Sequence, residues 1–379
     1  FRVRLKLHKN PYKPRPIANL GRSWIQPFAI WMCGVLAPIQ ATCASVVTSG
    51  RHALASLRRH VPPDHTLATI DAVNLYPSIE ADHMLVILCN RIQQHYVEKW
   101  NLARLACQIL RIIVYEQAVQ HHDGSFWIAA SGIATGLACG VFCANIYLDD
   151  CDRFVLQACQ TISNYQRFVD DVFVTTGSPT EVLQALSAWR PQSIRWEVSA
   201  AGDDVPFLDL ALKKSQNFLV SQLFRKELNA YLYVPADSSH PRRCKEGVIA
   251  SETERMYRVC THEVDFRRHL AFFQDRFSRR GYDMHRIKAV YDATIRRLKH
   301  GVKVQRTGKR FYLVTKFGST VNRQQLIRAL KKHDFILSRA FEQPASVSVA
   351  YSVQRNLFRL HYTDNWLPGQ GVVGRDRVF

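Results

Sequence analysis

The amino-acid sequence predicts an α+β fold with an acidic centre between two basic ends, and three observations lead to this prediction. The first is composition: 47% of the 379 residues are hydrophobic and 22% are charged, which is enough apolar material for buried cores. The second is the succession of helical and strand periodicities along the chain. The third is the distribution of charge. At this length we expect two or three structural units rather than one small module.

The net charge of +20 is unevenly distributed. Residues 1–60 carry ten Lys/Arg and no acid, residues 61–210 carry eight basic and seventeen acidic residues, and residues 211–379 carry thirty-three basic and fourteen acidic residues. The three segments therefore have net charges of +10, −9 and +19. Basic ends favour a nucleic-acid partner, and an acidic centre suits an enzyme that concentrates divalent cations. A simple RNA-coating protein has no use for such a centre.

Two features bear on the compartment and on membranes. The ten cysteines include no Cys-x-x-Cys pair, which argues against a zinc ribbon or a thioredoxin-type site and favours buried thiols in a reducing compartment, with a metal cluster as the alternative. Residues 27–47 are uncharged and long enough to cross a bilayer, but Pro27, Pro38 and Gln40 interrupt them. We expect a buried helix-turn-helix there rather than a membrane span, and no membrane partner.

Periodicity predicts the elements of the acidic centre. Residues 66–71 form a β-prone segment that ends in Asp71, and the proline and polar residues that follow end the strand. Residues 165–176 have two β-branched and aromatic arms around Asp170 and Asp171, which predicts a hairpin with carboxylates at its turn. The other predicted elements are helices over 84–92, 102–114 and 143–158 and a strand over 125–128.

Two adjacent acids between strand formers are unfavourable in a purely structural hairpin, because like charges repel. If Asp71 lies beside the turn with Asp170 and Asp171, the three carboxylates can hold two Mg²⁺ ions for in-line phosphoryl transfer. The alternative is a solvated acidic turn, since Asp149-Asp150 and Asp203-Asp204 show that such pairs arise elsewhere in the chain.

The order of these motifs resembles that of the reverse transcriptases, most closely the Penelope-like retroelement branch, which is related to telomerase. Asp71-Ala-Val-Asn-Leu-Tyr76 is similar to the first catalytic motif of that family, and Phe168-Val-Asp-Asp171 to the second. The glycine-bearing motif between them is similar to Gly132-x3-Gly136-x7-Ala-Asn145. Further likenesses are Lys6, His8-Lys9 and Arg15-Pro-Ile17 before the centre, and Arg225-Lys226, Ser239-His240-Pro241, Lys245-Glu-Gly247 and Arg280-Gly-Tyr282 after it.

The resemblance implies a role for each matching residue. Asp71, Asp170 and Asp171 match the catalytic, metal-binding carboxylates. The implied nucleotide-binding residues are Lys9, Arg15, Tyr76 and Gly136, with Tyr76 beside the sugar; a packed aromatic is the alternative for Tyr76. The implied nucleic-acid-binding residues are Arg225, Lys226, His240, Arg243 and Lys245.

The sequence also departs from the family pattern. Ser131 and Thr135 replace the residues usual around the first glycines, and no lysine lies between Lys99 and Lys213 to act as a general acid. The family often carries a GIY-YIG endonuclease after this region, whereas the sequence stops at Phe379, so we expect no target cleavage from this chain.

The resemblance implies a right-hand polymerase with a basic fingers segment at 1–60, a palm with an antiparallel sheet and interleaved fingers elements at 61–215, and a basic thumb with a helical C-terminal extension at 216–379. The expected activity is RNA-directed DNA synthesis with two Mg²⁺ ions, an RNA template and a DNA primer, in the nucleus or a mitochondrion. The alternatives are a catalytically silent scaffold that binds structured RNA among other proteins of an organellar ribonucleoprotein, such as a mitochondrial ribosome, and a template-independent terminal transferase.

Overall fold

The computed structural model of the protein describes residues 2–6, 13–17, 20, 23–120, 124–128, 131–226, 229–300, 309–316, 328 and 345–352. The chain divides into two compact units, Phe1–His300 and Gly301–Phe379. In the second unit, β12 (Lys309–Lys316) and β13 (Ala345–Ser352) pair in parallel. These segments were expected to belong to a helical extension, but both are rich in β-branched and aromatic residues and are strands.

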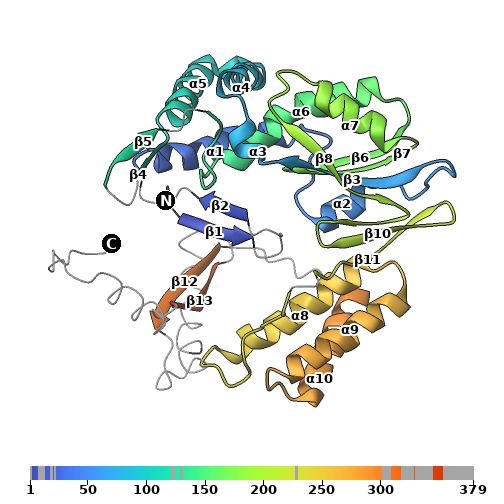
Figure 1. The fold of residues 1–379 in the computed structure, drawn as a ribbon. Helices are drawn as coiled ribbons and strands as arrows, with labels where there is room; N and C mark the ends of the chain where they lie inside the picture. Colours follow the sequence, from blue (N-terminus) through green and yellow to red (C-terminus); the bar gives the residue numbers. More distant parts are fainter. Residues whose placement is uncertain are drawn as a thin grey trace. The chain divides into compact units, whose positions relative to one another are not determined.

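A four-stranded antiparallel sheet forms the centre of the first unit (Figure 1). Its strands, in order, are β6 (Ile162–Phe168), β7 (Asp171–Thr176), β3 (Thr66–Val73) and β8 (Arg195–Gly202). This arrangement confirms the predicted antiparallel sheet, the strand that contains Asp71 and the hairpin around Asp170 and Asp171.

Both faces of the sheet are covered, as the two-residue alternation of side chains shows. Ile70 of β3 and Val172 and Val174 of β7 belong to one core, whereas Phe173 belongs to the other. On that second face the ring of Phe173 packs against Phe207, with ring centroids 5.5 Å apart.

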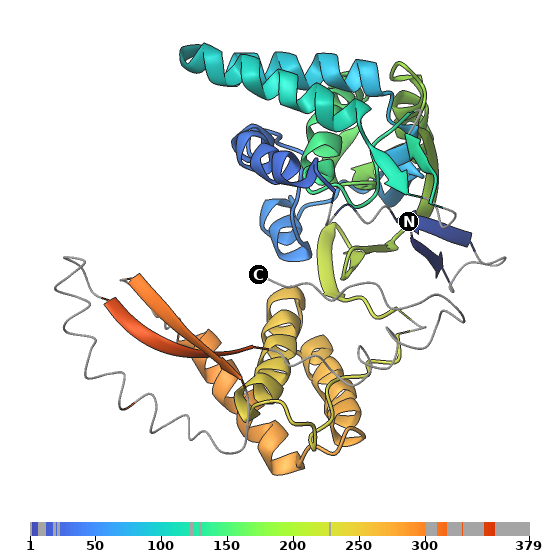
Figure 2. The ribbon, with the colours of Figure 1, turned by 90° about the vertical axis from the view of Figure 1, so that its left-hand side faces the viewer.

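The first core is built by five helices over one face of the sheet. Figure 2 shows two of them, Ala81–His95 and Trp100–Tyr115, running side by side. The predicted helices of the acidic centre are confirmed, because their apolar residues recur at helical spacing toward this core. The five helices are α1 (Gln26–Gln40), α4 (Ala81–His95), α5 (Trp100–Tyr115), α6 (Gly140–Ala158) and α7 (Pro179–Ala188).

The segment 27–47 differs from the expected buried helix-turn-helix. Only α1 lies within it, and turns follow as far as the start of the next helix at Gly50. One side of α1 packs on the core. More than a third of the side chain is exposed at Phe28 and Trp31 of this helix and at Trp24 just before it. Within the described part of the chain, no helix is long and apolar enough to cross a membrane.

The second core joins a smaller sheet to a helical group. The sheet contains β9 (Asp204–Phe207), β10 (Leu210–Ser215) and β11 (Phe218–Leu223). The helical group, coloured yellow to orange in Figure 1, contains α8 (Arg242–Val259), α9 (Glu263–Ser278) and α10 (Met284–Lys299). Phe273 and Phe277 of α9 are fully buried between these elements, so aromatic packing holds the group together.

Short elements complete the first unit. They are β1 (Arg2–Lys6) paired with β2 (Lys13–Ile17), α2 (Gly50–Ser56), α3 (Leu75–Ser78), η2 (Val97–Lys99), and β4 (Ala118–Gln120) paired with β5 (Phe126–Ile128). The predicted strand at 125–128 thus corresponds to β5.

Candidate active site

The three predicted carboxylates meet at one edge of the central sheet, where the middle strand β3 ends and the middle strand β7 begins. Asp71 near the end of β3 is the register partner of Asp171 at the start of β7. The backbone N–H of Ala72 donates to the carbonyl of Asp170 at 3.0 Å, which ties the hairpin turn to β3. Antiparallel pairing therefore brings together acids that are far apart in the sequence.

The turn itself is tight and strained. Phe168 pairs with Asp171, so the turn contains only Val169 and Asp170. Val169 has a φ of 57°, a region that β-branched residues seldom occupy and that costs on the order of 1–3 kcal/mol. The surrounding structure must hold the turn in place.

The electrostatics of this edge reflect the crowding of the acids. Burial raises the pKa of Asp171 to about 7; the charges of Asp170 and Asp71 and a hydrogen bond with Asp71 act in the same direction, and the charge of Lys226 opposes them. A bound cation would relieve this repulsion, and carboxylate oxygens are the ligands that Mg²⁺ prefers. Among the described residues, however, no group of three or more His, Cys, Asp or Glu side chains is already arranged to hold a metal ion.

Tyr76 lies next to this edge, on the short helix α3 that follows β3. Burial raises the pKa of its hydroxyl to about 12, and the charge of Asp170 adds to the effect. The ring also packs against the first core, and a Cβ at Gly140 would lie 3.6 Å from it. The structure thus places Tyr76 both beside the carboxylates and in the core, so both interpretations of this residue agree with its position.

The glycine-bearing loop lies directly against the Tyr76 turn. Gly132 has a φ of +76°, and a Cβ there would come within 2.6 Å of the carbonyl oxygen of Tyr76 and of the Cα of Pro77. Only glycine allows this approach. Gly136 has a φ of +119° and is exposed on the same loop.

A residue that sequence reasoning missed, Gln117, fixes this loop. Its side chain is 1% exposed, donates to the carbonyls of Val114 and Gly132, and accepts from the backbone N–H of Ala134. The sequence gives little indication of this role, because the two loop residues that Gln117 bonds to, Gly132 and Ala134, follow it by fifteen and seventeen residues.

The predicted basic contacts fall into separate groups. Lys226, after β11, is exposed and close enough to the carboxylates for its charge to lower the pKa of Asp171. The guanidinium of Arg225 stacks on Phe272, 4.0 Å from the ring centroid. Arg15 lies on β2, opposite Arg4, and Lys9 lies outside the described residues.

Lys245 has a structural role in the fold. Its ammonium donates to the carbonyls of Ala236 at 2.6 Å and Ser238 at 3.1 Å. It therefore fixes the segment before α8. His240 in that segment is exposed, with Nδ1 3.3 Å from the Ser238 hydroxyl.

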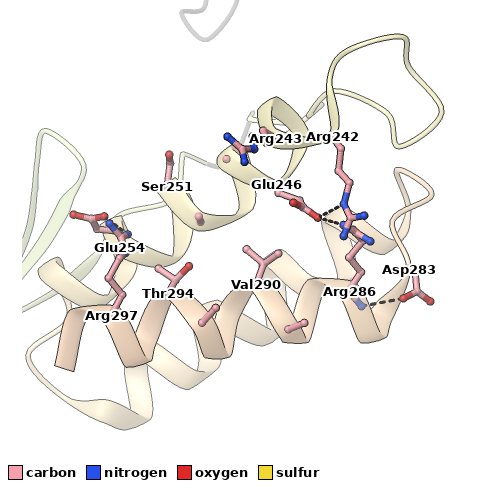
Figure 3. A pocket seen from close by; sticks show the side chains of 14 residues that line it. Arg242, Arg243, Glu246, Ser251, Glu254, Asp283, Arg286, Val290, Thr294 and Arg297 are labelled. Carbon is pink, nitrogen blue, oxygen red and sulfur yellow. Dashed lines mark hydrogen bonds and ion pairs between the residues drawn. The ribbon is translucent and has the colours of Figure 1, made fainter. Parts of the chain in front are cut away.

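Arg243 lies in an open groove of about 850 Å³ between α8 and α10 (Figure 3). Two carboxylates of α8 bridge arginines across the groove. Glu246 pairs with Arg242 and Arg286, and Glu254 pairs with Arg258 and Arg297. The groove lining contains four arginines and three acidic residues, so it carries a small excess of positive charge.

The sequence family described as "Animal helix-turn-helix domain" matches residues 232–290, which span α8, α9 and the beginning of α10. No curated protein matches the sequence.

Solved structures with partial likeness include two telomerases and a viral polymerase. Telomerase from Candida albicans, in complex with a fragment of telomeric RNA, has a TM-score of 0.42 at 11% identity, covering 62% of this chain and 43% of that one. Apo telomerase from Candida tropicalis has a TM-score of 0.40 at 9% identity, covering 80% and 53%. The RNA-dependent RNA polymerase of BmCPV has a TM-score of 0.44 at 8% identity, covering 68% and 25%. The chain thus spans about half or less of each of these chains, and at TM-scores below 0.5 the likenesses carry no conclusion about activity.

Proposed function

We propose that the chain is an RNA-directed DNA polymerase, a right-hand reverse transcriptase of the Penelope-like branch, which joins deoxynucleotides to a primer 3′-hydroxyl. The observation that carries the proposal is the meeting of Asp71 with Asp170 and Asp171 at one edge of an antiparallel sheet. A purely structural hairpin gains nothing from three carboxylates that repel one another.

Asp71, Asp170 and Asp171 are the residues that would hold two Mg²⁺ ions, because they offer hard oxygen ligands on adjacent strands. The chemistry that such ions supply when bound is activation of the 3′-hydroxyl and neutralisation of the triphosphate. Beside them, Tyr76 is the residue proposed to limit the space available to the nucleotide sugar, and Gly132 allows the glycine-bearing loop to lie against the Tyr76 turn.

Nucleic acid is proposed to lie along the basic residues that follow the sheet. Lys226 is the positive charge near the carboxylates, and Arg243 lies in the groove between α8 and α10. Arginine and lysine at such positions bind phosphates without reading sequence. All ten cysteines are free thiols, which agrees with work in a reducing compartment such as the nucleus or a mitochondrion.

One observation favours a second candidate, an RNA-binding scaffold that has lost catalysis. Within the described residues no group of three or more His, Cys, Asp or Glu side chains is arranged to hold a metal ion. A scaffold would keep the basic surfaces and would not need the carboxylates.

Primer extension with dNTPs and Mg²⁺ on an RNA template tests the proposal. Native protein should extend the primer, and Asp170→Asn should abolish extension while leaving RNA affinity unchanged. Asp204→Asn, which removes an exposed acid from β9, is the matched control and should be fully active.

Two results would contradict a template-directed polymerase. Equal RNA binding with no extension by the native protein, in Mg²⁺ or Mn²⁺, would establish the scaffold. Extension that continues without a template would establish a terminal transferase.

A further inference from the structure

Arg167 is a charged residue in the middle of the first unit, with 0% of its side chain exposed. It lies on β6, three residues before Asp170, and every nitrogen of its guanidinium donates a hydrogen bond. Nε donates to both carboxylate oxygens of Asp152 at 3.0 Å, and Nη2 donates to one of them at 2.8 Å. Nη1 donates to Oδ1 of Asn145 at 3.0 Å, and Nη2 to the carbonyl of Asn145 at 3.0 Å.

The sixth hydrogen bond reaches the hairpin turn. Nη1 of Arg167 donates to the carbonyl of Val169 at 3.2 Å. Val169 is the turn residue with positive φ, so its carbonyl is held in an orientation that the backbone alone would not prefer. The side chain of Arg167 thus braces the turn that presents Asp170.

The brace is anchored on elements outside the hairpin. Asp152 and Asn145 belong to α6, and the amide of Asn145 donates to Gln40 of α1 at 2.9 Å. The backbone of Arg167 also exchanges hydrogen bonds with the segment after α1, donating to Ser45 at 2.8 Å and accepting from Val47 at 2.9 Å. The turn is therefore connected to two helices through one side chain.

We propose that Arg167 is a positioning residue, which holds the Val169–Asp170 turn so that the carboxylates of Asp170 and Asp171 face Asp71. The catalytic part of this inference rests on the proposed polymerase function; the structural part does not. Lysine cannot replace Arg167. The three donors of an ammonium group radiate from one atom, so they cannot reproduce the six hydrogen bonds that the planar guanidinium makes to Asp152, Asn145 and Val169.

A buried ion pair also contributes to stability, so the test needs variants that separate the two roles. Arg167→Met/Asp152→Leu removes both charges together, which buried pairs tolerate far better than the loss of one partner. Arg167→Lys keeps the charge opposite Asp152 but loses the donor to Val169, and serves if the double variant does not fold. Arg91→Met/Asp149→Leu is the matched control, because it removes an ion pair of 2.9 Å that is also anchored on α6 and that, in the part of the chain the structure describes, does not bond to the turn.

Two readouts are needed, and one of them does not depend on activity. Amide hydrogen exchange at Ala72 reports the turn, because that N–H donates to the carbonyl of Asp170. We expect exchange at Ala72 to become about tenfold faster or more in Arg167→Lys and in the double variant, with the middle of β3 unchanged. In primer extension, kcat should fall about a hundredfold with little change in the KM for dNTP, because the carboxylates are misplaced. The control should match the native protein in both.

The outcomes are distinguishable. Unchanged exchange at Ala72 in folded variants, or an unchanged kcat in an active enzyme, overturns the inference. If the native protein does not extend primers, the polymerase proposal fails, and faster exchange at Ala72 alone would still establish Arg167 as the residue that positions the turn.

Discussion

The sheet edge that carries the carboxylates and the three-helix group α8–α10 both contain many charged side chains, but they hold them differently. At the sheet, Arg167 and Asp152 have 0% and 1% of their side chains exposed. On α9, the ion pair of Arg267 and Glu263 leaves 75% and 69% exposed. In a buried site each charge depends on one arrangement of partners, whereas exposed charges exchange partners with water and salt.

This difference indicates where the substitution of a single side chain should have a large effect. Near the carboxylates, we expect individual substitutions to change activity and stability sharply. On the helical group, we expect the sum of positive charge to matter more than any one arginine.

The largest expected effect separates activity from stability at the sheet. Asp71→Asn should lower primer extension about 10³-fold or more, because it removes a carboxylate that the proposed mechanism needs. The same change should stabilise the metal-free protein at pH 8 by on the order of 1 kcal/mol, since it removes a charge that raises the pKa of Asp171.

The sign follows from the direction of that shift. A folded-state pKa of about 7, above the ordinary value of 3.8, means that Asp171 costs stability as pH rises through 7. Thermal unfolding at pH 5 and pH 8 without Mg²⁺ measures the effect. A variant that is inactive and also less stable at pH 8 would show that repulsion does not control this edge.

The second effect compares one arginine from each region. Arg167→Met should lower the free energy of unfolding by about 3–5 kcal/mol, because it leaves Asp152 buried without its charge partner. Arg267→Met should change it by less than about 0.5 kcal/mol. Urea unfolding followed by circular dichroism measures both, and similar losses from the two variants would remove the distinction between the regions.

The third effect lies inside the helical group and opposes the pH dependence of the sheet. His269 is 2% exposed, and neither ring nitrogen has a hydrogen-bond partner within the part of the chain that the structure describes. Burial lowers its pKa to about 4, and the charges of Arg225 and Arg268 add to this.

The His269 ring is therefore neutral in the folded protein. Stability is lost as pH falls from 6.5, the ordinary pKa of histidine, toward the folded-state pKa of about 4. Between pH 7.5 and pH 5 we expect His269 to contribute a loss of about 1–2 kcal/mol, so the change in the free energy of unfolding between the two pH values should differ by that amount between the native protein and His269→Leu. Chemical unfolding at the two pH values measures the difference, and equal slopes in both proteins would exclude His269 as the cause.

The smallest effect concerns nucleic-acid binding by the groove. Arg243→Ala should weaken RNA binding modestly and lower the slope of log K against log salt by about 0.7–0.9, the value for one phosphate contact. Arg267→Ala, on the same helical group but outside the groove, is the control. Fluorescence anisotropy between 50 and 200 mM salt, about the range over which such slopes are measured, gives both slopes. Identical slopes would place the phosphates elsewhere.

The sequence by itself determined most of the local structure and the carboxylate positions. Alternating β-branched residues around Asp71, Asp170 and Asp171 were sufficient for β3 and the hairpin, and helical spacing was sufficient for α4, α5 and α6. These strands and helices depend on neighbours within a few residues, so the periodicity of the sequence is sufficient to predict them. The wrong expectation of a buried helix-turn-helix over 27–47 arose because an uncharged segment does not show which of its faces is covered.

Only the tertiary structure decided which residues support the site. Nothing in the sequence shows that Arg167 turns inward to Asp152, that Gln117 holds the glycine loop, or that Lys245 donates to two backbone carbonyls. Burial of a polar side chain depends on partners that arrive from distant segments, and a polar residue is costly to bury until those partners are in place. The sequence therefore predicts where the acids lie along the chain, and the packing of α1 and α6 against the sheet determines how they are held.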